Sequence, residues 1–272
     1  MYRSGIASDP YASLASAAPL MNFGVGAALA YYTAGTVDWQ TAPDSVDPAG
    51  RSSEVTAQRD LSGLVGLSYA LPRTGLRLGA GAEVLRTEIL EEYTGVALAG
   101  SAGALFEVPA WNILFGGSVQ HLGDRIRMSG DPKGEKGTLL PGILRLGARY
   151  EFNLGSAGLS LSRIRTVEYP EPESVPAPMV FRLSAEYAFR FNEGAEEYGA
   201  GLEMVPMAPL AFRAGFRTIF RGTATQQNSY ALGLGFMLSL FRLDYSVELL
   251  PVASASVHRV GLIFSPRKPR EE

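Results

Sequence analysis

Apolar and polar residues alternate with a period of two along most of this chain. In the segment from Phe241 to Leu249, odd positions carry Phe, Leu, Tyr, Val and Leu, whereas even positions carry Arg, Asp, Ser and Glu. Successive side chains of a β-strand point to opposite faces, so an extended chain gives this segment one apolar and one charged face. A helix would spread the same charges around its circumference. The segment is therefore predicted to be a β-strand.

The same separation recurs through the chain. Each repeat places four or five apolar residues on one face, which suits the ~9–11 residues that a tilted strand needs to cross a bilayer. The pattern predicts strands near 20–33, 61–71, 75–87, 94–106, 111–121, 140–153, 157–165, 178–191, 197–206, 209–219, 228–238, 240–249 and 256–265.

Connections of two kinds join these expected strands. Those at 72–75, 107–110, 153–158 and 206–209 are short, whereas those at 39–56, 123–139, 166–177 and 220–227 are long and polar. Outer-membrane barrels carry short turns on one side and long loops on the other. We therefore predict an all-β fold, an antiparallel transmembrane β-barrel of about 12–14 strands over residues 20–265. Residues 1–19 are expected to form an irregular N-terminal segment, and 266–272 a charged C-terminal tail.

A soluble β-sandwich is the main alternative, because it also buries one face of each strand and solvates the other. Two features favour the membrane. The apolar rows lack the lysine and proline that protect exposed edge strands, and aromatic residues gather near strand ends as in an interfacial girdle. These aromatics are Tyr31, Tyr32, Tyr69, Trp111, Tyr150, Phe152, Phe189, Phe191, Tyr230 and Phe264.

The number of expected strands, thirteen, conflicts with the even number found in single-chain bacterial barrels. The alternation of short and long connections also breaks between 156 and 198, so one strand is either miscounted there or missing at the N-terminus. The uncharged segment from Pro10 to Val37 is interrupted by Pro19 and lacks the pattern of a signal peptide. We therefore expect a truncated or processed N-terminus. The strand near Met21 should then be unpaired on one side, or closed imperfectly against the strand at 258–264.

Composition mainly excludes functions. The chain has no cysteine and only two histidines, His121 and His258, so a thiolate metal site is impossible and a histidine-based centre has little material. The net charge of -3 argues against a nucleic-acid partner, which requires clustered positive charge. Both histidines are expected to be structural. The acidic pair Glu196-Glu197 is expected in a solvated loop.

Three segments of small residues resemble functional loops of two kinds but lie inside expected strands. Ala99–Gly103 has the spacing of a nucleophile elbow, which requires a strand-to-helix turn, an acid and a histidine. Gly24–Leu29 and Gly79–Gly81 resemble dinucleotide loops but lack the third small residue and the following helix. We interpret all three as small residues of packed strands, and we predict no enzyme activity and no catalytic, cofactor-binding or metal-binding residues.

The polar faces of the expected strands carry interleaved arginines and carboxylates. The candidate lumen-lining residues are Arg145, Arg149, Arg182, Glu186, Glu203, Arg213, Arg217, Arg242, Asp244 and Glu248. They support two interpretations: a salt-bridged lumen that holds a narrow barrel together, or a pathway for an anionic ligand such as a fatty-acid carboxylate. The salt-bridged interpretation predicts specific pairs. Arg213, Arg217 and Arg242 should pair with Glu203, Asp244 or Glu248.

Several ordered phrases resemble the PorV/PorQ-type outer-membrane barrels, a branch related to the FadL transporters, over roughly residues 20–265. They are Leu67-Ser68-Tyr69-Ala70 before Leu76-Arg77-Leu78-Gly79, Gly103-Ala104-Leu105 before Gly116 to Gly123, Leu140-Pro141 before Leu146 to Tyr150, Gly201-Leu202-Glu203 before Phe212 to Phe216, Leu243-Asp244-Tyr245, and His258 to Leu262. The chain departs from the family before Met21, where neither a signal peptide nor an Asn-Pro-Ala-Gly-like segment occurs. Ser101 also stands where an acidic residue is expected.

The resemblance implies a location in the outer membrane of a Gram-negative-type bacterium, and one of two functions. PorV-like members serve type IX protein secretion, with extracellular loops that bind secretion-machinery or secreted proteins. FadL-like members pass long-chain fatty acids or other hydrophobic compounds. The expected partners are therefore outer-membrane lipid together with such proteins or hydrophobic small molecules, and no cofactor is expected.

Overall fold

The computed structural model describes residues 2–4, 10–40, 52–129, 137–155, 158–160, 179–207, 209–222, 225–237, 240–250 and 255–265. These residues form one 17-stranded antiparallel sheet and a separate 2-stranded sheet. A three-residue 3-10 helix, η1 (Pro109–Trp111), joins two strands. No helix in this part of the chain combines the length and the hydrophobicity needed to cross a bilayer.

The strands follow one another closely along the chain. Their bounds are β1 (Tyr2–Ser4), β2 (Pro10–Leu20), β3 (Phe23–Thr33), β4 (Thr36–Gln40), β5 (Ser52–Thr56), β6 (Gln58–Ala70), β7 (Leu76–Ile89), β8 (Tyr93–Val108), β9 (Ile113–Gly123), β10 (Arg125–Ser129), β11 (Thr138–Leu139), β12 (Ile143–Gly155), β13 (Gly158–Ser160), β14 (Met179–Arg190), β15 (Ala195–Met207), β16 (Leu210–Arg221), β17 (Thr225–Met237), β18 (Phe241–Leu250) and β19 (Ala255–Phe264).

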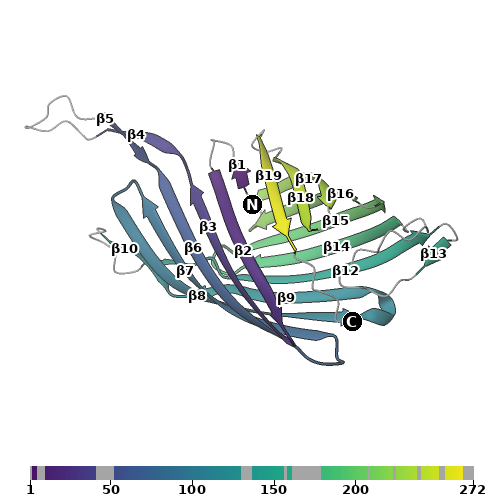
Figure 1. Cartoon of the computed structure of the whole chain (residues 1–272). Coiled ribbons are helices and arrows are strands. Elements are labelled where there is room, and N and C mark those ends of the chain that lie inside the picture. The colour runs from purple at the N-terminus through teal and green to yellow at the C-terminus, as the bar shows by residue number, and fades with distance from the viewer. Residues whose placement is uncertain are drawn as a thin grey trace, which may run out of the picture.

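Long strands that are consecutive in the chain are also neighbours in the sheet. The pairing runs from β2 through β3, β6, β7, β8, β9, β12 and β14 to β19. The sheet curls, so β2, β3 and β6 run steeply across the front while β12, β14 and β15 pass behind them at a large angle (Figure 1). The three residues of β1 pair with 258–260 of β19 and with 10–12 of β2, and they link the two ends of the sheet.

Twelve of the thirteen expected strands are long strands of the sheet, and β2, which was not expected, is a further one. Four of the 17 strands, β1, β10, β11 and β13, have only two to five residues, which leaves 13 long strands. The expected strand at 157–165 is a strand only at Gly158–Ser160, and 161–165 lie outside the described residues. The expected loop at 166–177 and the tail at 266–272 lie outside them too.

The N-terminal part differs from the expectation. Pro10–Leu20, expected within an irregular segment, forms β2 and pairs with β3 from Tyr11 to Leu20. The strand after Met21, β3, is therefore paired on both sides, by β2 and β6. Both predicted arrangements of the strand near Met21, an unpaired edge and an imperfect closure against 258–264, are wrong, because an Ala- and Ser-rich strand precedes it in the same hairpin.

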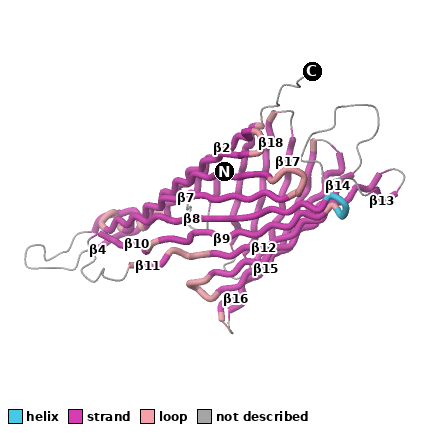
Figure 2. Tube along the Cα trace, turned by 90° about the horizontal axis from the view of Figure 1, so that it is seen from below, coloured by secondary structure: helices cyan, strands magenta, loops and turns pink. Residues whose placement is uncertain are grey.

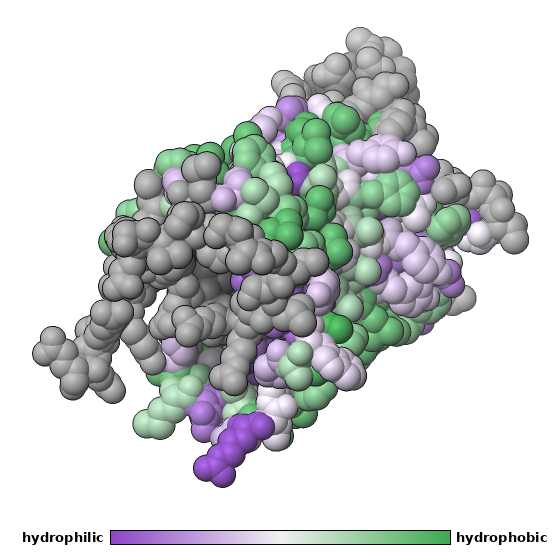
Figure 3. Space-filling view, turned by 90° about the vertical axis from the view of Figure 1, so that its right-hand side faces the viewer, coloured by the Kyte–Doolittle hydropathy of each residue, from purple (hydrophilic) through white to green (hydrophobic). Residues whose placement is uncertain are grey.

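Apolar side chains lie on the outer face of the curled sheet, and charged side chains lie on its inner face. On β18, Leu243 is 49% exposed whereas Glu248 is 4% exposed, as the alternation predicts. Apolar side chains cover broad areas of the wall visible in Figure 3. A soluble β-sandwich would pack these leucines against a second sheet, whereas lipid solvates an apolar outer face.

Outward-facing aromatic rings meet near both ends of the strands. At the end with short turns, the ring centroids of Phe23 and Tyr69 lie 4.8 Å apart, and those of Phe241 and Phe264 lie 5.0 Å apart. Tyr198 contacts Tyr187 at 5.2 Å near the opposite end. Two such levels are typical of the aromatic girdles at the two surfaces of a membrane.

Candidate functional site on the inner face

Alternating charges cross the inner face of β12 to β18 in a row. Arg182 on β14 contacts Glu151 on β12, with Nε and Oε2 2.7 Å apart, and it also contacts Glu203 on β15. Glu203 contacts Arg213 on β16, whose Nη1 lies 2.7 Å from Oδ1 of Asp244 on β18. The row, called the first charge row below, ends at Arg242, whose Nε lies 2.8 Å from the other carboxylate oxygen of Asp244.

A second charge row runs parallel to the first, nearer the opposite ends of the strands. Glu197 on β15 lies 3.4 Å from both Arg190 on β14 and Arg217 on β16. Arg217 also contacts Glu248 on β18, and Glu248 contacts Arg259 on β19. Carboxylates thus lie between pairs of guanidinium groups in both rows.

Strand register explains why these charges meet. Glu203 lies directly opposite Arg182 on one side and Arg213 on the other, so all three point to the same face. The contact from Arg213 to Asp244 must pass over β17, where Gly235 stands. A Cβ atom on Gly235 would lie 2.8 Å from Oδ1 of Asp244 and 2.9 Å from Nη2 of Arg213. The absence of a side chain at this position therefore makes room for the ion pair.

The carboxylates of both rows are shielded from water. Glu151 and Glu197 are each 7% exposed, and Glu248 is 4% exposed. A buried carboxylate is strongly unfavourable unless cations and hydrogen-bond donors surround it. The paired guanidinium groups meet this requirement, so this wall carries many charges but little local net charge.

Arg149 on β12 is different. Among the described residues it has no carboxylate partner, and its Nε is buried without a hydrogen-bond acceptor. It lies opposite Ser184 on β14 and Leu114 on β9. Together with Gly201 and Gly215 these residues line a cavity of about 730 Å³. Arg149 is therefore a guanidinium group available to a molecule in this cavity.

The inner face of β3, β6, β7 and β8 consists mainly of small residues, among them Gly26, Gly66 and Gly81. Here Oε2 of Glu83 lies 2.9 Å from Nδ1 of His121, in a geometry that does not form a hydrogen bond. His121 has a φ of 55° beside an irregularity in the β8–β9 register. This histidine thus has a structural contact in the wall.

The structure brings together nine of the ten residues proposed from the sequence to line the lumen. Seven belong to the two charge rows, and Arg145 pairs separately with Glu186; Arg149 is the exception. Arg213, Arg217 and Arg242 pair with Glu203, Glu248 and Asp244 as predicted.

Three members of the second charge row, Arg190, Glu197 and Arg259, are not among the ten residues proposed from the sequence. Glu197 was expected in a solvated loop, but β15 begins at Ala195 and places this side chain on the inner face. The expected strand at 197–206 already begins at this residue, and the alternation back from Glu203 places it on the inner face.

No family model and no curated protein matches this chain. Among solved structures, it is similar to the toluene transporter TodX of Pseudomonas putida, with a TM-score of 0.54, 11% identity, and 93% of this chain and 80% of that chain covered. It is also similar to the toluene transporter TbuX of Ralstonia pickettii, with a TM-score of 0.51, 10% identity, and 96% and 85% covered. At these identities the likeness shows the fold: an antiparallel sheet of the kind found in these barrel transporters.

Proposed function

We propose that this chain is an outer-membrane channel for small, largely apolar molecules. The observation that carries the proposal is the inner face, where paired charges leave little local net charge and Arg149 is the one candidate residue without an acidic partner in the part of the chain that the structure describes. The apolar outer face, the two levels of aromatic contacts and the fold shared with two toluene transporters support a place in the outer membrane.

Pairing of the wall charges favours uncharged over charged solutes. Ion-selective pores present rings of one sign, which attract a counter-ion. Here Glu197, Glu203 and Glu248 each lie between two arginines, so their charge is already compensated. The opposite wall adds glycine and alanine, which leave space and present apolar surface.

Arg149 gives the cavity one place for a polar group of a ligand. A guanidinium group binds a carboxylate through short, charge-assisted hydrogen bonds. An apolar molecule with a carboxylate would therefore satisfy the buried Nε of Arg149, whereas a hydrocarbon such as toluene has no acceptor for it. We infer that the channel retains fatty-acid-like molecules longer than hydrocarbons. The secretion role implied by the PorV resemblance finds no support in the comparisons and is not part of the proposal.

Uptake by vesicles tests this function. The full chain is reconstituted in lipid vesicles, and entry of toluene and of a long-chain fatty acid is compared with that into protein-free vesicles. We expect the wild-type protein to speed the entry of both compounds. In Arg149→Met the acceleration should be about 10-fold smaller for the fatty acid and unchanged for toluene, because a charge-assisted contact is lost. Arg221→Met, at the exposed end of β16, is the matched control and should behave like the wild type. Entry no faster than in protein-free vesicles would reject the channel function.

A further inference from the structure

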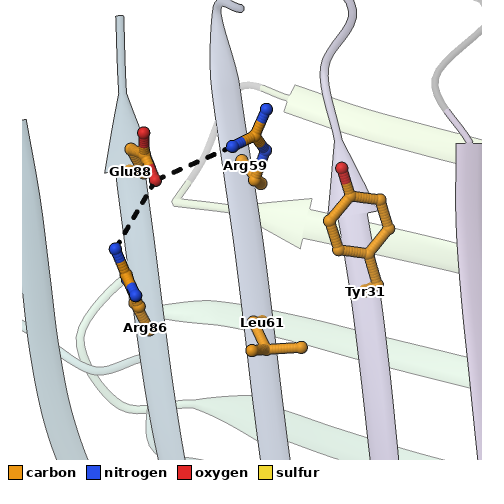
Figure 4. A pocket seen from close by; sticks show the side chains of 5 residues that line it. All are labelled: Tyr31, Arg59, Leu61, Arg86 and Glu88. Carbon is orange, nitrogen blue, oxygen red and sulfur yellow. Dashed lines mark ion pairs between the residues drawn. The ribbon is translucent and has the colours of Figure 1, made fainter. Parts of the chain in front are cut away.

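A small pocket with two arginines lies on the outer face, where the apolar surface of β6 and β7 ends. Arg59 and Arg86 stand on either side of Glu88, and Leu61 and Tyr31 complete the lining (Figure 4). The Tyr31 hydroxyl lies at the height of Arg59 in this view. These five residues are called the arginine pocket below, and its volume is about 180 Å³.

Register places the arginine pocket on the lipid-facing side of the sheet. Leu61 lies opposite Arg86, on the same face as the outward-facing Leu67 and Leu78, which are 66% and 46% exposed. From Leu78 to Arg86 the strand rises about 27 Å at ~3.4 Å per residue. With a tilt of ~40° this is about 20 Å across the membrane, close to the ~25 Å height of the apolar band of a barrel. Arg86 therefore reaches the level of the lipid headgroups.

The pocket belongs to the end of the sheet with extended connections. Figure 2 places β4, β10 and β11 at one end and η1 and β13 at the other. The connections at 34–57 and 124–142 lie at the end of Arg86, together with short turns at 90–92 and 191–194, whereas the opposite end has tight turns at 21–22 and 71–75 and one long connection, after β12. Long loops of outer-membrane barrels face the outside of the cell, so the arginine pocket faces the outer leaflet.

The charges of this pocket are less completely paired than those of the inner face. Oε2 of Glu88 lies 4.0 Å from Nη1 of Arg59 and 3.8 Å from Nη2 of Arg86, and 44% and 58% of these arginine side chains are exposed. Within the described residues neither guanidinium group donates a hydrogen bond, whereas Arg182 binds Glu151 at 2.7 Å. Among the five lining residues, one carboxylate and two guanidinium groups leave a net positive charge with free donors, and Glu91 lies within electrostatic range of Arg59 alone.

A third arginine extends the positive surface. Val96 on β8 is the Cα partner of both Arg86 on β7 and Arg127 on β10. Directly opposed residues point to the same face of a sheet, and Arg127 is exposed. Three arginines thus follow one another along the headgroup level of this wall.

We propose that the arginine pocket binds the phosphate groups of phosphorylated glycolipids in the outer leaflet. Guanidinium groups match phosphate in geometry and charge and bind it through paired hydrogen bonds. Arg59 and Arg86 would hold the phosphate, while Leu61 and the ring of Tyr31 contact the sugar and the start of the acyl chains. A tyrosine at this level is suited to such a contact, because one end of its side chain is apolar and the other polar.

Lipid retention by the purified full chain tests this site. The protein is folded in detergent and titrated with lipid A that carries its phosphates, with the same lipid after removal of the phosphates, and with inorganic phosphate alone. Native mass spectrometry counts the bound lipid, and the gel shift between folded and heated protein shows that each variant has folded. We expect Arg59→Gln/Arg86→Gln to weaken binding of the phosphorylated lipid about 10-fold or more, because two charge-assisted contacts are lost. Arg73→Gln/Arg221→Gln, which removes two exposed arginines elsewhere, should bind like the wild type.

A second variant has the opposite expected sign. Glu88→Gln removes the carboxylate that competes with phosphate for the two arginines, so it should tighten binding by about 3-fold or more. Equal affinity for lipids with and without phosphates would overturn the proposal, as would unchanged affinity in the folded double variant. Equally tight binding of inorganic phosphate would also overturn it, by showing an anion site without preference for lipid. Solute uptake is not involved in these measurements, so they are independent of the channel function.

Discussion

Leu243 and Glu248 lie on the same strand, yet the leucine is exposed and the glutamate is buried. In water both positions would cost free energy. The apolar side chain would be exposed to water, and the charged side chain would lose its hydration. It is favourable when lipid surrounds the outer face and arginines surround the glutamate. The solvent that each residue requires can therefore be deduced from its exposure together with its polarity.

Leu243→Arg tests this conclusion directly. The substitution should destabilise the protein by about 2–4 kcal/mol if position 243 lies near the midplane of the membrane, because the charge would face hydrocarbon. Urea unfolding in lipid vesicles measures the change. Ser246→Arg, on the inner face of the same strand, is the control and should cost clearly less. Similar costs at both positions would argue against a lipid-facing outer surface.

Gly235 tests the contact over β17. In Gly235→Ala the added methyl group should separate Arg213 from Asp244 and destabilise the protein by about 1–3 kcal/mol, the usual cost of an unsatisfied hydrogen-bonding group. Gly215→Ala is the control, because its Cβ would find its nearest neighbour at an ordinary 3.6 Å. Equal unfolding free energies for the two variants would show that Arg213 and Asp244 do not need this space.

The sequence predicted which residues face inward more reliably than which residues pair. Charged residues with a period of two identify a face without knowledge of the neighbouring strand. The partner of Arg213 on β18 depends on a glycine in the intervening strand and on register, which no local pattern contains. Glu197 was misplaced for a different reason, because charged residues at the start of a strand resemble those of a loop.

Among the elements, the turn between β7 and β8 places two residues with side chains in the left-handed backbone conformation, which favours glycine. Leu90 and Glu91 have φ values of 54° and 59°, and a left-handed backbone costs about 1–2 kcal/mol for a residue with a side chain. Leu90→Gly should therefore stabilise the protein by up to about 1 kcal/mol in urea unfolding. Glu92→Gly, at the last position of the turn, is the control and should not stabilise the protein. A stabilisation equal to that of Leu90→Gly would show that backbone conformation is not the cause.

The same turn holds β5 through a pH-dependent contact. The backbone N–H of Thr56 donates to Oε1 of Glu91 at 3.2 Å, and the Thr56 hydroxyl donates to it at 2.6 Å. These hydrogen bonds hold the pKa of Glu91 below its ordinary value. A lowered pKa means that the contact is fully present above the ordinary pKa of a glutamate, about 4.3, and is lost as the pH falls through the folded value.

Hydrogen exchange at the Thr56 amide measures this dependence. After correction for intrinsic exchange rates, protection should be constant between about pH 6 and 8 and decrease below about pH 4. In Glu91→Gln, which keeps the shape but not the charge, protection should be lower and independent of pH. Constant protection of the wild-type amide down to pH 3 would contradict the assignment.

Twelve of the thirteen long strands were predicted from the sequence, and β2 was not. β2 was missed because Pro10–Leu20 contains only Ala, Ser, Leu, Tyr and Pro, so no polar face marks its period. It is a strand because its backbone pairs with β3 over ten residues. Of the expected strand at 157–165, which alternates in sequence, the described residues Gly158–Ser160 pair with β12.

For the whole molecule, the link between its two ends depends on β1. Tyr2 is the Cα partner of Val260, and the chain contains no cysteine. Tyr2→Cys/Val260→Cys should therefore form a disulfide without competing thiols, seen as faster migration of the unreduced protein in a denaturing gel. Tyr2→Cys/Leu262→Cys, two positions along the strand, should crosslink far less. Equal crosslinking of both pairs would mean that this register is not fixed.

The two halves of the sheet differ in what fixes the register of neighbouring strands, because the charge rows lie in the C-terminal half. A slip of two residues keeps every side chain on its face, so hydrophobicity alone does not prevent it. Between β14 and β15 such a slip would separate Arg182 from Glu203 and leave each of these half-buried charges with one partner instead of two. Between β3 and β6 it would exchange one glycine or alanine for another. The C-terminal half therefore has charge pairs that favour the correct register during assembly, whereas in the N-terminal half tight turns set the register of the β2–β3, β6–β7 and β7–β8 hairpins.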